Sequence, residues 1–235
     1  MSDLERHPTL RRIAGLVTRA PGAFAAILAA FVLLLTASGG PAQAQDTQRA
    51  LVAGGCFWCV ESDFRRVDGV TDVRVGFAGG EEVNPSYRDV VSGRTGHLEA
   101  AMISFDPSVI SYDQILHLFM RSIDPLDAGG QFCDRGRHYT TAIFALDDSQ
   151  HASAEAALRR AAADLGEPIA TALRAEMPFY EAEDYHQNYA NSSDMVMTRF
   201  GPRQMRNAYR LYRQSCGRDA RVRELWGDDA PFLRD

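Results

Sequence analysis

Apolar runs and helical patterns alternate along most of the chain, and this alternation predicts a mixed α/β fold. Apolar or alternating segments predict strands at residues 50–53, 70–77, 98–105, 139–146 and 169–176. Apolar residues at helical spacing predict helices at residues 57–66, 111–123 and 148–165. Because helices and strands alternate, residues 45–235 are expected to form one α/β or α+β domain with two layers.

Segments rich in glycine and polar residues separate these elements. Residues 78–94 and 124–137 are predicted as long loops, and residues 179–191 as a polar, aromatic loop. Long loops inside a compact domain usually carry function, so the first two are expected to hold site residues. The remaining tail has possible short helices at residues 205–213 and 222–226.

The first 44 residues have the pattern of a secretory signal. Four arginines precede an apolar run at residues 23–35, and Pro41-Ala42-Gln43-Ala44 then offers small residues for cleavage after Ala44. We therefore expect residues 1–44 to be a signal peptide and the protein to be periplasmic. An uncleaved membrane anchor is the alternative, although the run is short for a span. The pair Arg11-Arg12 leaves a twin-arginine signal open.

Composition and charge narrow the function classes. The chain has 235 residues, 46% of them hydrophobic, which suits one domain with a real core. The formal net charge is −6, and basic residues form no long run, so no nucleic-acid partner is expected. A monomer without a stable membrane span after signal cleavage is the simplest expectation.

Cys56 is the candidate nucleophile. It follows Gly54-Gly55 where a predicted strand gives way to a helix, and a helix N-terminus favours the thiolate and lowers a thiol's pKa. Cys59 lies one helical turn further on, where the spacing suits disulfide exchange. The alternatives are an inert buried thiol and a zinc site completed by Cys133 or Cys216 with a histidine.

Several motifs follow one another along residues 49–191. They are Gly55-Cys56-Phe57-Trp58-Cys59-Val60-Glu61, Asn84-Pro85-Ser86-Tyr87, Ser92-Gly93-Arg94-Thr95-Gly96-His97-Leu98-Glu99-Ala100, Tyr112-Asp113-Gln114-Ile115-Leu116, Asp134-Arg135-Gly136-Arg137-His138-Tyr139 and Phe179-Tyr180-Glu181-Ala182-Glu183-Asp184-Tyr185-His186-Gln187. In this order they resemble the motifs of one known family, the A-type peptide methionine sulfoxide reductases.

The resemblance implies a fold, a reaction and partners. The fold would be an α/β roll around a mixed sheet with a ferredoxin-like core. The reaction would be reduction of the S epimer of methionine sulfoxide, free or in oxidised proteins and peptides, to methionine. No bound cofactor would be needed, but an external dithiol reductant of the thioredoxin type would be required.

The resemblance also implies roles for individual residues. Cys56 would attack the sulfoxide sulfur and become a sulfenic acid, while buried Glu99 would be the acid for the sulfoxide oxygen. Tyr87 and Tyr139 would donate hydrogen bonds to that oxygen, and Cys59 would form a disulfide with Cys56.

Three further residues would bind the substrate in this scheme. Phe57 and Trp58 would hold its S-methyl group, and Asp134 would bind its backbone amide or position water. His97 and His186 are expected to be structural.

The resemblance leaves the resolving cysteine open. Many family members have glycine where Cys59 stands and recycle through cysteines in a C-terminal tail. Cys216 is therefore the possible alternative resolving cysteine, although Cys133 and Cys216 could instead form a structural bridge. Outside the family, the Cys56–Cys59 spacing alone would also suit a periplasmic thioredoxin-like thiol-disulfide oxidoreductase.

Overall fold

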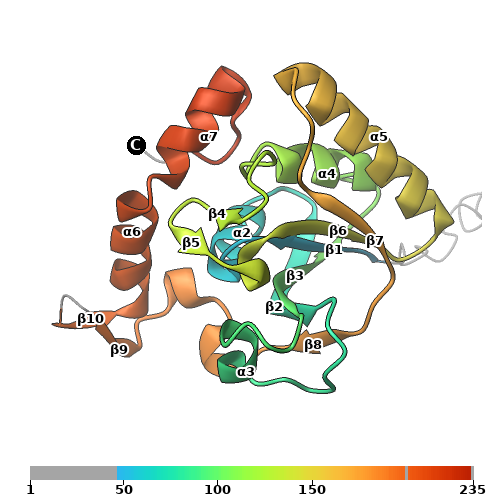
Figure 1. Cartoon of the computed structure of the whole chain (residues 1–235). Coiled ribbons are helices and arrows are strands. Elements are labelled where there is room, and N and C mark those ends of the chain that lie inside the picture. The colour runs from blue at the N-terminus through green and yellow to red at the C-terminus, as the bar shows by residue number, and fades with distance from the viewer. Residues whose placement is uncertain (1–46, 199–200, 234–235) are drawn as a thin grey trace, which may run out of the picture. The chain divides into compact units, whose positions relative to one another are not determined.

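The computed structural model describes residues 47–198 and 201–233. The predicted signal peptide therefore lies outside the described residues. Within them, no helix combines the length and the apolar character needed to cross a membrane. Figure 1 shows a central sheet with helices packed against it and a helical C-terminal tail.

A mixed sheet of six strands forms the centre of the domain. Its spatial order is β7-β6-β1-β3-β2-β8, with β6 and β7 parallel and the other neighbours antiparallel. The strands are β1 (Gln48–Gly54), β2 (Val70–Ala78), β3 (Leu98–Phe105), β6 (Thr141–Ala145), β7 (Ala172–Ala175) and β8 (Phe179–Glu181). This confirms the predicted mixed sheet, while the finer description as a roll stays a prediction.

Helices cover one face of the sheet and form the main core with it. Among the described residues, the α-helices are α2 (Phe57–Phe64), α3 (Tyr87–Val91), α4 (Tyr112–Met120), α5 (Asp148–Leu165), α6 (Met205–Ser215) and α7 (Arg218–Trp226). Val52, Ile103 and Ile143 of the sheet pack in one buried cluster with Phe64 of α2 and Phe119 of α4. Burial of such side chains, at about 1.5–3 kcal/mol each, is the main stabilisation of this layer.

Local signals explain where the helices begin and end. Ser111 caps α4: its side chain accepts a hydrogen bond from the Gln114 backbone N–H, and its own backbone N–H donates one to Oε1 of Gln114. Asp147 caps α5, which ends at Gly166 with a left-handed φ of 68°. Serine and aspartate are among the residues that most favour this position at the start of a helix.

The loops hold more structure than predicted. Residues 78–94 contain α3, which is capped by Ser86 and Asp89, and residues 179–191 supply the edge strand β8. Residues 124–137 contain the two-residue strands β4 (Gly130–Gln131) and β5 (Asp134–Arg135). The prediction of Tyr139 in a strand is wrong, because it closes a short 3-10 helix, Arg137–Tyr139.

The C-terminal tail packs back on the domain as helices. Strands β9 (Met195–Thr198) and β10 (Gly201–Gln204) form a small separate sheet that leads into α6 and then α7. The tail returns along α2, and Tyr209 of α6 joins a buried cluster with Cys56 and Cys59. The tail therefore closes one side of the region around the predicted nucleophile.

Candidate active site

Cys56 lies at the turn between β1 and α2, where it is the N-cap residue of the helix. Gly55 precedes it with a φ of +80°, and a Cβ there would come 2.5 Å from the Cβ of Gln131. Only glycine fits this turn without strain. The glycine turn fixes the thiol at the start of the helix, with the side chain 6% exposed.

Cys56 and Cys59 are a pair of free, buried thiols. Their side chains share a hydrogen bond, which shifts the pKa values of the two thiols in opposite directions. Burial, the bond to Cys59 and nearby carboxylates raise the pKa of Cys56. The same bond and the charges of Arg218 and Arg213 lower the pKa of Cys59 to about 7.

The predicted lowering of the Cys56 pKa is therefore wrong. The helix N-terminus is present as expected, but desolvation of a buried sulfur outweighs it. The first proton leaves the pair from Cys59, and the thiol that remains donates to that thiolate.

Glu99 lies on β3, which brings its carboxyl group to the start of α2. It is 1% exposed, and its Oε2 accepts a hydrogen bond of 3.0 Å from the backbone N–H of Phe57. Burial raises the pKa of Glu99 to about 8, with further contributions from Asp134 and Cys59, against the lowering effect of the Phe57 bond. The carboxyl is therefore mostly protonated at neutral pH, as an acid catalyst requires.

Tyr87 and Tyr139 bring two hydroxyl groups to the same place. Tyr87 begins α3, and its hydroxyl shares a hydrogen bond with Tyr139. Burial and the charges of Glu99 and Cys56 raise the pKa of both phenols, so both are neutral donors. Glu99, Tyr87, Tyr139 and the thiol pair thus converge from four separate segments.

Aromatic side chains form a wall beside the thiols. Phe57 is fully buried, and the Trp58 ring stacks on Tyr189 with centroids 3.9 Å apart. The His186 ring contacts two further rings of this wall, with its centroid 5.2 Å from that of Phe57 and 4.4 Å from that of Tyr87. Such a wall suits an uncharged methyl and thioether group.

The two histidines of the motifs differ. His97 accepts a hydrogen bond at Nδ1 from the Gly80 backbone, and its Nε2 lies 2.8 Å from the Glu82 carbonyl, so it is structural as predicted. Burial lowers the pKa of His186 to about 4, so its ring is neutral. His186 lines the aromatic wall, which the sequence analysis did not expect of it.

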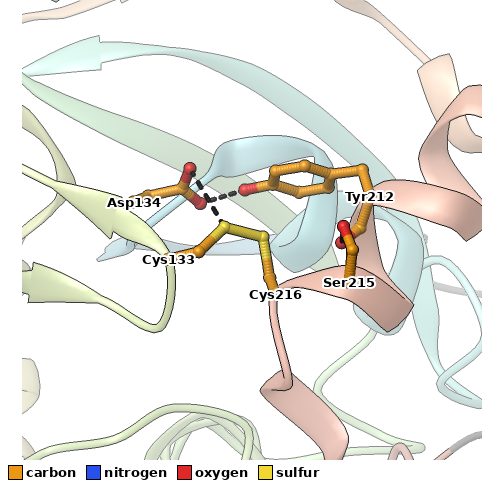
Figure 2. Close-up of a disulfide and its surroundings, with 5 residues drawn as sticks. All are labelled: Cys133, Asp134, Tyr212, Ser215 and Cys216. Atoms are coloured by element: carbon orange, nitrogen blue, oxygen red, sulfur yellow. Dashed lines mark hydrogen bonds between the residues drawn. A yellow bond between two sulfur atoms is a disulfide. The ribbon is translucent and has the colours of Figure 1, made fainter. Parts of the chain in front are cut away.

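Asp134 lies beside a disulfide at the edge of the site. Cys133 and Cys216 are bonded to each other, and the Tyr212 hydroxyl donates a hydrogen bond to the Asp134 carboxylate, as Figure 2 shows. Burial raises the pKa of Asp134, against the Tyr212 bond and the charge of Arg218. The Cys133–Cys216 bridge, which the sequence left as one possibility, is present.

A pocket of about 410 Å³ opens next to this disulfide. Trp58, Tyr189 and Tyr212 line it together with Cys133 and Cys216. Tyr189 and Tyr212 were not singled out from the sequence. The spacing of Tyr209 and Tyr212, which places both on one side of a predicted helix, is a signal that could have pointed to Tyr212.

Comparison with known proteins shows which family the chain belongs to. The family model for peptide methionine sulfoxide reductase matches residues 48–216. The chain belongs to this family. As a member, it is an enzyme that reduces methionine sulfoxide.

Relatives of this reductase cover most of its length. It is 42% identical over 207 residues to peptide methionine sulfoxide reductase MsrA 2 of Rhizobium meliloti, covering 88% of this chain and 94% of the relative. It is 40% identical over 190 residues to the MsrA of Bacillus licheniformis, covering 78% and 96%.

Solved structures agree with the family assignment. Mxr1 from Saccharomyces cerevisiae in reduced form has a TM-score of 0.59 at 31% identity, covering 65% of this chain and 87% of that one. Methionine sulfoxide reductase A of Corynebacterium diphtheriae has a TM-score of 0.57 at 30% identity, covering 63% and 75%.

The family assignment favours the sulfoxide reductase over the alternatives. The thioredoxin-like interpretation gave no use to Glu99, Tyr87 and Tyr139, which converge on the thiols here. The zinc interpretation needed Cys133 or Cys216 as a thiolate ligand, and a disulfide takes up both sulfurs.

Proposed function

We propose that this reductase acts on the S epimer of methionine sulfoxide through a sulfenic acid on Cys56 and a Cys56–Cys59 disulfide. The observation that carries the proposal is the meeting of a hydrogen-bonded buried thiol pair with a protonated carboxyl group. A sulfoxide sulfur is attacked readily only when its oxygen takes a proton or strong hydrogen bonds, and the site supplies both.

In the first step, the Cys56 sulfur attacks the sulfoxide sulfur. Glu99 gives its proton to the sulfoxide oxygen, and Tyr87 and Tyr139 donate hydrogen bonds to it. The oxygen passes to Cys56 as the S–O bond of the substrate and the newly formed bond between the two sulfurs break, and methionine leaves. Cys56 is then a sulfenic acid, and the proton that its thiol lost returns to Glu99.

Substrate binding uses the edges of the same site. Phe57 and Trp58 hold the S-methyl group, and Asp134 binds the backbone amide of a methionine sulfoxide residue or positions water. The preference for the S epimer is proposed from the family resemblance. A site of fixed shape can discriminate between the epimers, because the chirality at sulfur decides which substituent faces this wall.

In the second step, the Cys59 thiolate attacks the sulfenic sulfur of Cys56. An S–S bond forms, the S–O bond breaks, and the oxygen leaves as water after taking up a proton. Cys59 is favoured over Cys216 because it lies within hydrogen-bond reach of Cys56, whereas Cys216 is bonded to Cys133.

An external dithiol then returns the enzyme to its starting state. A protein of the thioredoxin type is the proposed reductant, and oxidised proteins or peptides are the proposed substrates. The signal-like N-terminus supports a periplasmic location, in which the enzyme repairs exported proteins.

A stereospecific assay tests the proposal. Residues 45–235 are incubated with dithiothreitol and each epimer of dabsyl-methionine sulfoxide, and dabsyl-methionine is measured. We expect turnover of the S epimer and little of the R epimer. Equal turnover of both epimers would contradict the proposed stereochemistry, and no turnover of either would contradict the mechanism.

A further inference from the structure

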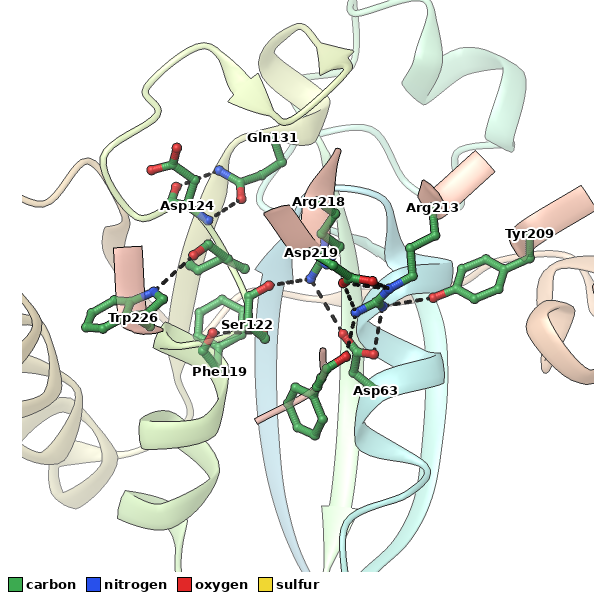
Figure 3. A network of polar contacts seen from close by, with 12 residues as sticks. Asp63, Phe119, Ser122, Asp124, Gln131, Tyr209, Arg213, Arg218, Asp219 and Trp226 are labelled. Atoms are coloured by element: carbon green, nitrogen blue, oxygen red, sulfur yellow. Dashed lines mark hydrogen bonds and ion pairs between the residues drawn. The ribbon is translucent and has the colours of Figure 1, made fainter. Parts of the chain in front are cut away.

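A buried ionic network joins the C-terminal tail to the helix that carries the thiols. Figure 3 shows Arg213 of α6 and Arg218 of α7 converging on Asp63 of α2. Their side chains are nearly fully buried, at 4%, 2% and 0% exposed. Burial of a charge at this depth has a large desolvation free energy unless the charge is paired, so the pairing of these three side chains is part of the folded structure.

Arg213 is held by several partners at once. Its Nη1 donates to Asp63 Oδ1 at 2.8 Å and to the Tyr209 hydroxyl at 3.1 Å. Its Nε and Nη2 donate to Asp219, and Nη2 also donates to the carbonyl of Phe232. The guanidinium group is therefore fixed in position.

Arg218 is fixed from other directions. Its Nη2 donates to the Ser122 carbonyl at 2.6 Å and lies 3.8 Å from Asp63 Oδ2. Its guanidinium carbon lies 4.8 Å from the centre of the Phe132 ring, in the turn that carries Cys133. Within the described part of the chain, its buried Nε has no hydrogen-bond partner.

The network reaches the thiol pair by direct packing. Asp63 follows Cys59 by four residues on α2, so the two side chains share one face of the helix. Tyr209 packs in the same buried cluster as Cys56 and Cys59 and accepts from Arg213. The guanidinium groups of Arg213 and Arg218 carry two positive charges, and the fully buried Asp63 carboxylate carries one negative charge. A net positive charge therefore lies near Cys59, and Asp219, which is 20% exposed, offsets it only in part.

We propose that Arg213 and Arg218 are positioning residues for the resolving step, in which their charges stabilise the Cys59 thiolate as it attacks the Cys56 sulfenic acid. The proposal rests on the proposed function and extends it to residues outside the family motifs. In this step the Cys59 sulfur is oxidised, the Cys56 sulfur is reduced, and water leaves.

The electrostatics around Cys59 agree with this geometry. Both arginines lower the pKa of Cys59, and Asp63 opposes them. The titratable and charged groups that face Cys59 come from its own helix, from β3 and from both tail helices. They are Cys56, Asp63, Glu99, Tyr209, Tyr212, Arg213 and Arg218.

Single-turnover chemistry without reductant tests the proposal. One equivalent of the S epimer is added, methionine release reports the first step, and dimedone trapping with mass spectrometry reports how long the sulfenic acid survives. For Arg218→Met and Arg213→Met we expect methionine release within about twofold of wild type. Disulfide formation should slow about fivefold at pH 7 and recover as the pH is raised, since a rise of one unit from a pKa of about 7 lowers the thiolate fraction at pH 7 from about one half to about one tenth.

Two variants separate charge from structure. Arg218→Lys keeps the charge and should restore most of the rate. Asp63→Asn removes the opposing negative charge and should shift the pH profile of disulfide formation to lower pH, the direction opposite to the arginine variants. A merely structural network would slow the step in all of these variants and leave the pH profile in place.

Arg221→Met is the matched control. Arg221 is also on α7, but it pairs with Asp124 and Glu224 and is 35% exposed. It should leave both steps unchanged. If the arginine-to-methionine variants do not fold, the pH profiles of Arg218→Lys and Asp63→Asn decide.

The outcomes separate this inference from the proposed function. No methionine release by the wild-type enzyme would contradict the proposed function itself. Normal release with an unchanged pH profile of disulfide formation in the charge variants would overturn the role of the arginines alone.

Discussion

The four cysteines form two pairs in contrasting environments. Cys56 and Cys59 are free, 6% and 3% exposed, and face a protonated carboxyl group. Cys133 and Cys216 are bonded across 83 residues at the edge of the site, where Cys133 is exposed. The difference teaches that the surroundings of a sulfur pair decide its role: the buried carboxyl of Glu99 and the hydroxyls of Tyr87 and Tyr139 meet at the first pair, whereas the second pair is already joined.

The second pair lies where the tail meets the domain. Cys216 falls between Arg213 and Arg218, and Cys133 lies next to Phe132, on which Arg218 stacks. The disulfide therefore ties the turn between α6 and α7, which carry the two arginines, to the loop that carries Phe132. We assign the first pair to chemistry and the second to holding the tail, and the following changes test that division.

Cys56→Ser should have the largest effect. Without the sulfur that takes the oxygen, turnover of the S epimer should disappear, because the proposed mechanism forms the sulfenic acid on Cys56. Cys59→Ser is the matched control. It should release one equivalent of methionine per enzyme and then stop, as measured by dabsyl-methionine in a rapid-quench experiment. Release of one equivalent of dabsyl-methionine by Cys56→Ser would contradict the assignment of Cys56 as the nucleophile.

Glu99→Gln should lower the rate of the first step by about 100-fold to 1000-fold, because the proton donor is lost. The pH dependence follows from the raised pKa of about 8. The wild-type carboxyl is protonated below that pH and loses its proton above it, so the rate should fall as pH rises through about 8. This fall in rate should be absent in Glu99→Gln. If the rapid-quench pH profile of Glu99→Gln still falls near pH 8, the group that titrates there is not Glu99.

Tyr87→Phe and Tyr139→Phe should each slow the first step by about 10-fold, which corresponds to one lost hydrogen bond of about 1.4 kcal/mol. The effect is smaller because two hydroxyls serve one oxygen. The double variant should lose more than either single variant. Methionine release at saturating substrate measures this, and a double variant as fast as wild type would remove both phenols from the mechanism.

Cys133→Ala/Cys216→Ala should change the first step least, within about twofold, since neither sulfur takes part in it. Its effect should be on stability, with a loss of about 2–4 kcal/mol in the free energy of unfolding because the long closed loop is released. Urea unfolding measures this. A large loss of first-step rate with little loss of stability would reverse the roles of the two pairs.

Much of the fold was predictable because local signals agreed. The apolar run at β1, the glycine turn and the helical spacing after Cys56 together placed the nucleophile at a helix start. Ser111 and Asp147 marked their helices. Helix α3 was missed, although Ser86 and Asp89 form a capping box, because glycine, asparagine and proline dominate the composition around it.

The chemistry of the site was less predictable than its position. Helix placement alone suggested a lowered pKa for Cys56, but burial depends on tertiary packing and raised it. The network of Asp63 with Arg213 spans 150 residues of sequence, so no local pattern points to it. From the sequence alone, charged residues in a C-terminal tail are predicted to be exposed, and only the structure shows that Arg213 and Arg218 are buried.

Disulfide mapping after one turnover tests the central claim most directly. Enzyme with Cys133–Cys216 intact and two free thiols receives one equivalent of the S epimer without reductant, and its peptides are mapped by mass spectrometry. The account predicts a new Cys56–Cys59 disulfide with Cys133–Cys216 unchanged. A Cys56–Cys216 disulfide, with Cys133 released as a free thiol, would contradict it.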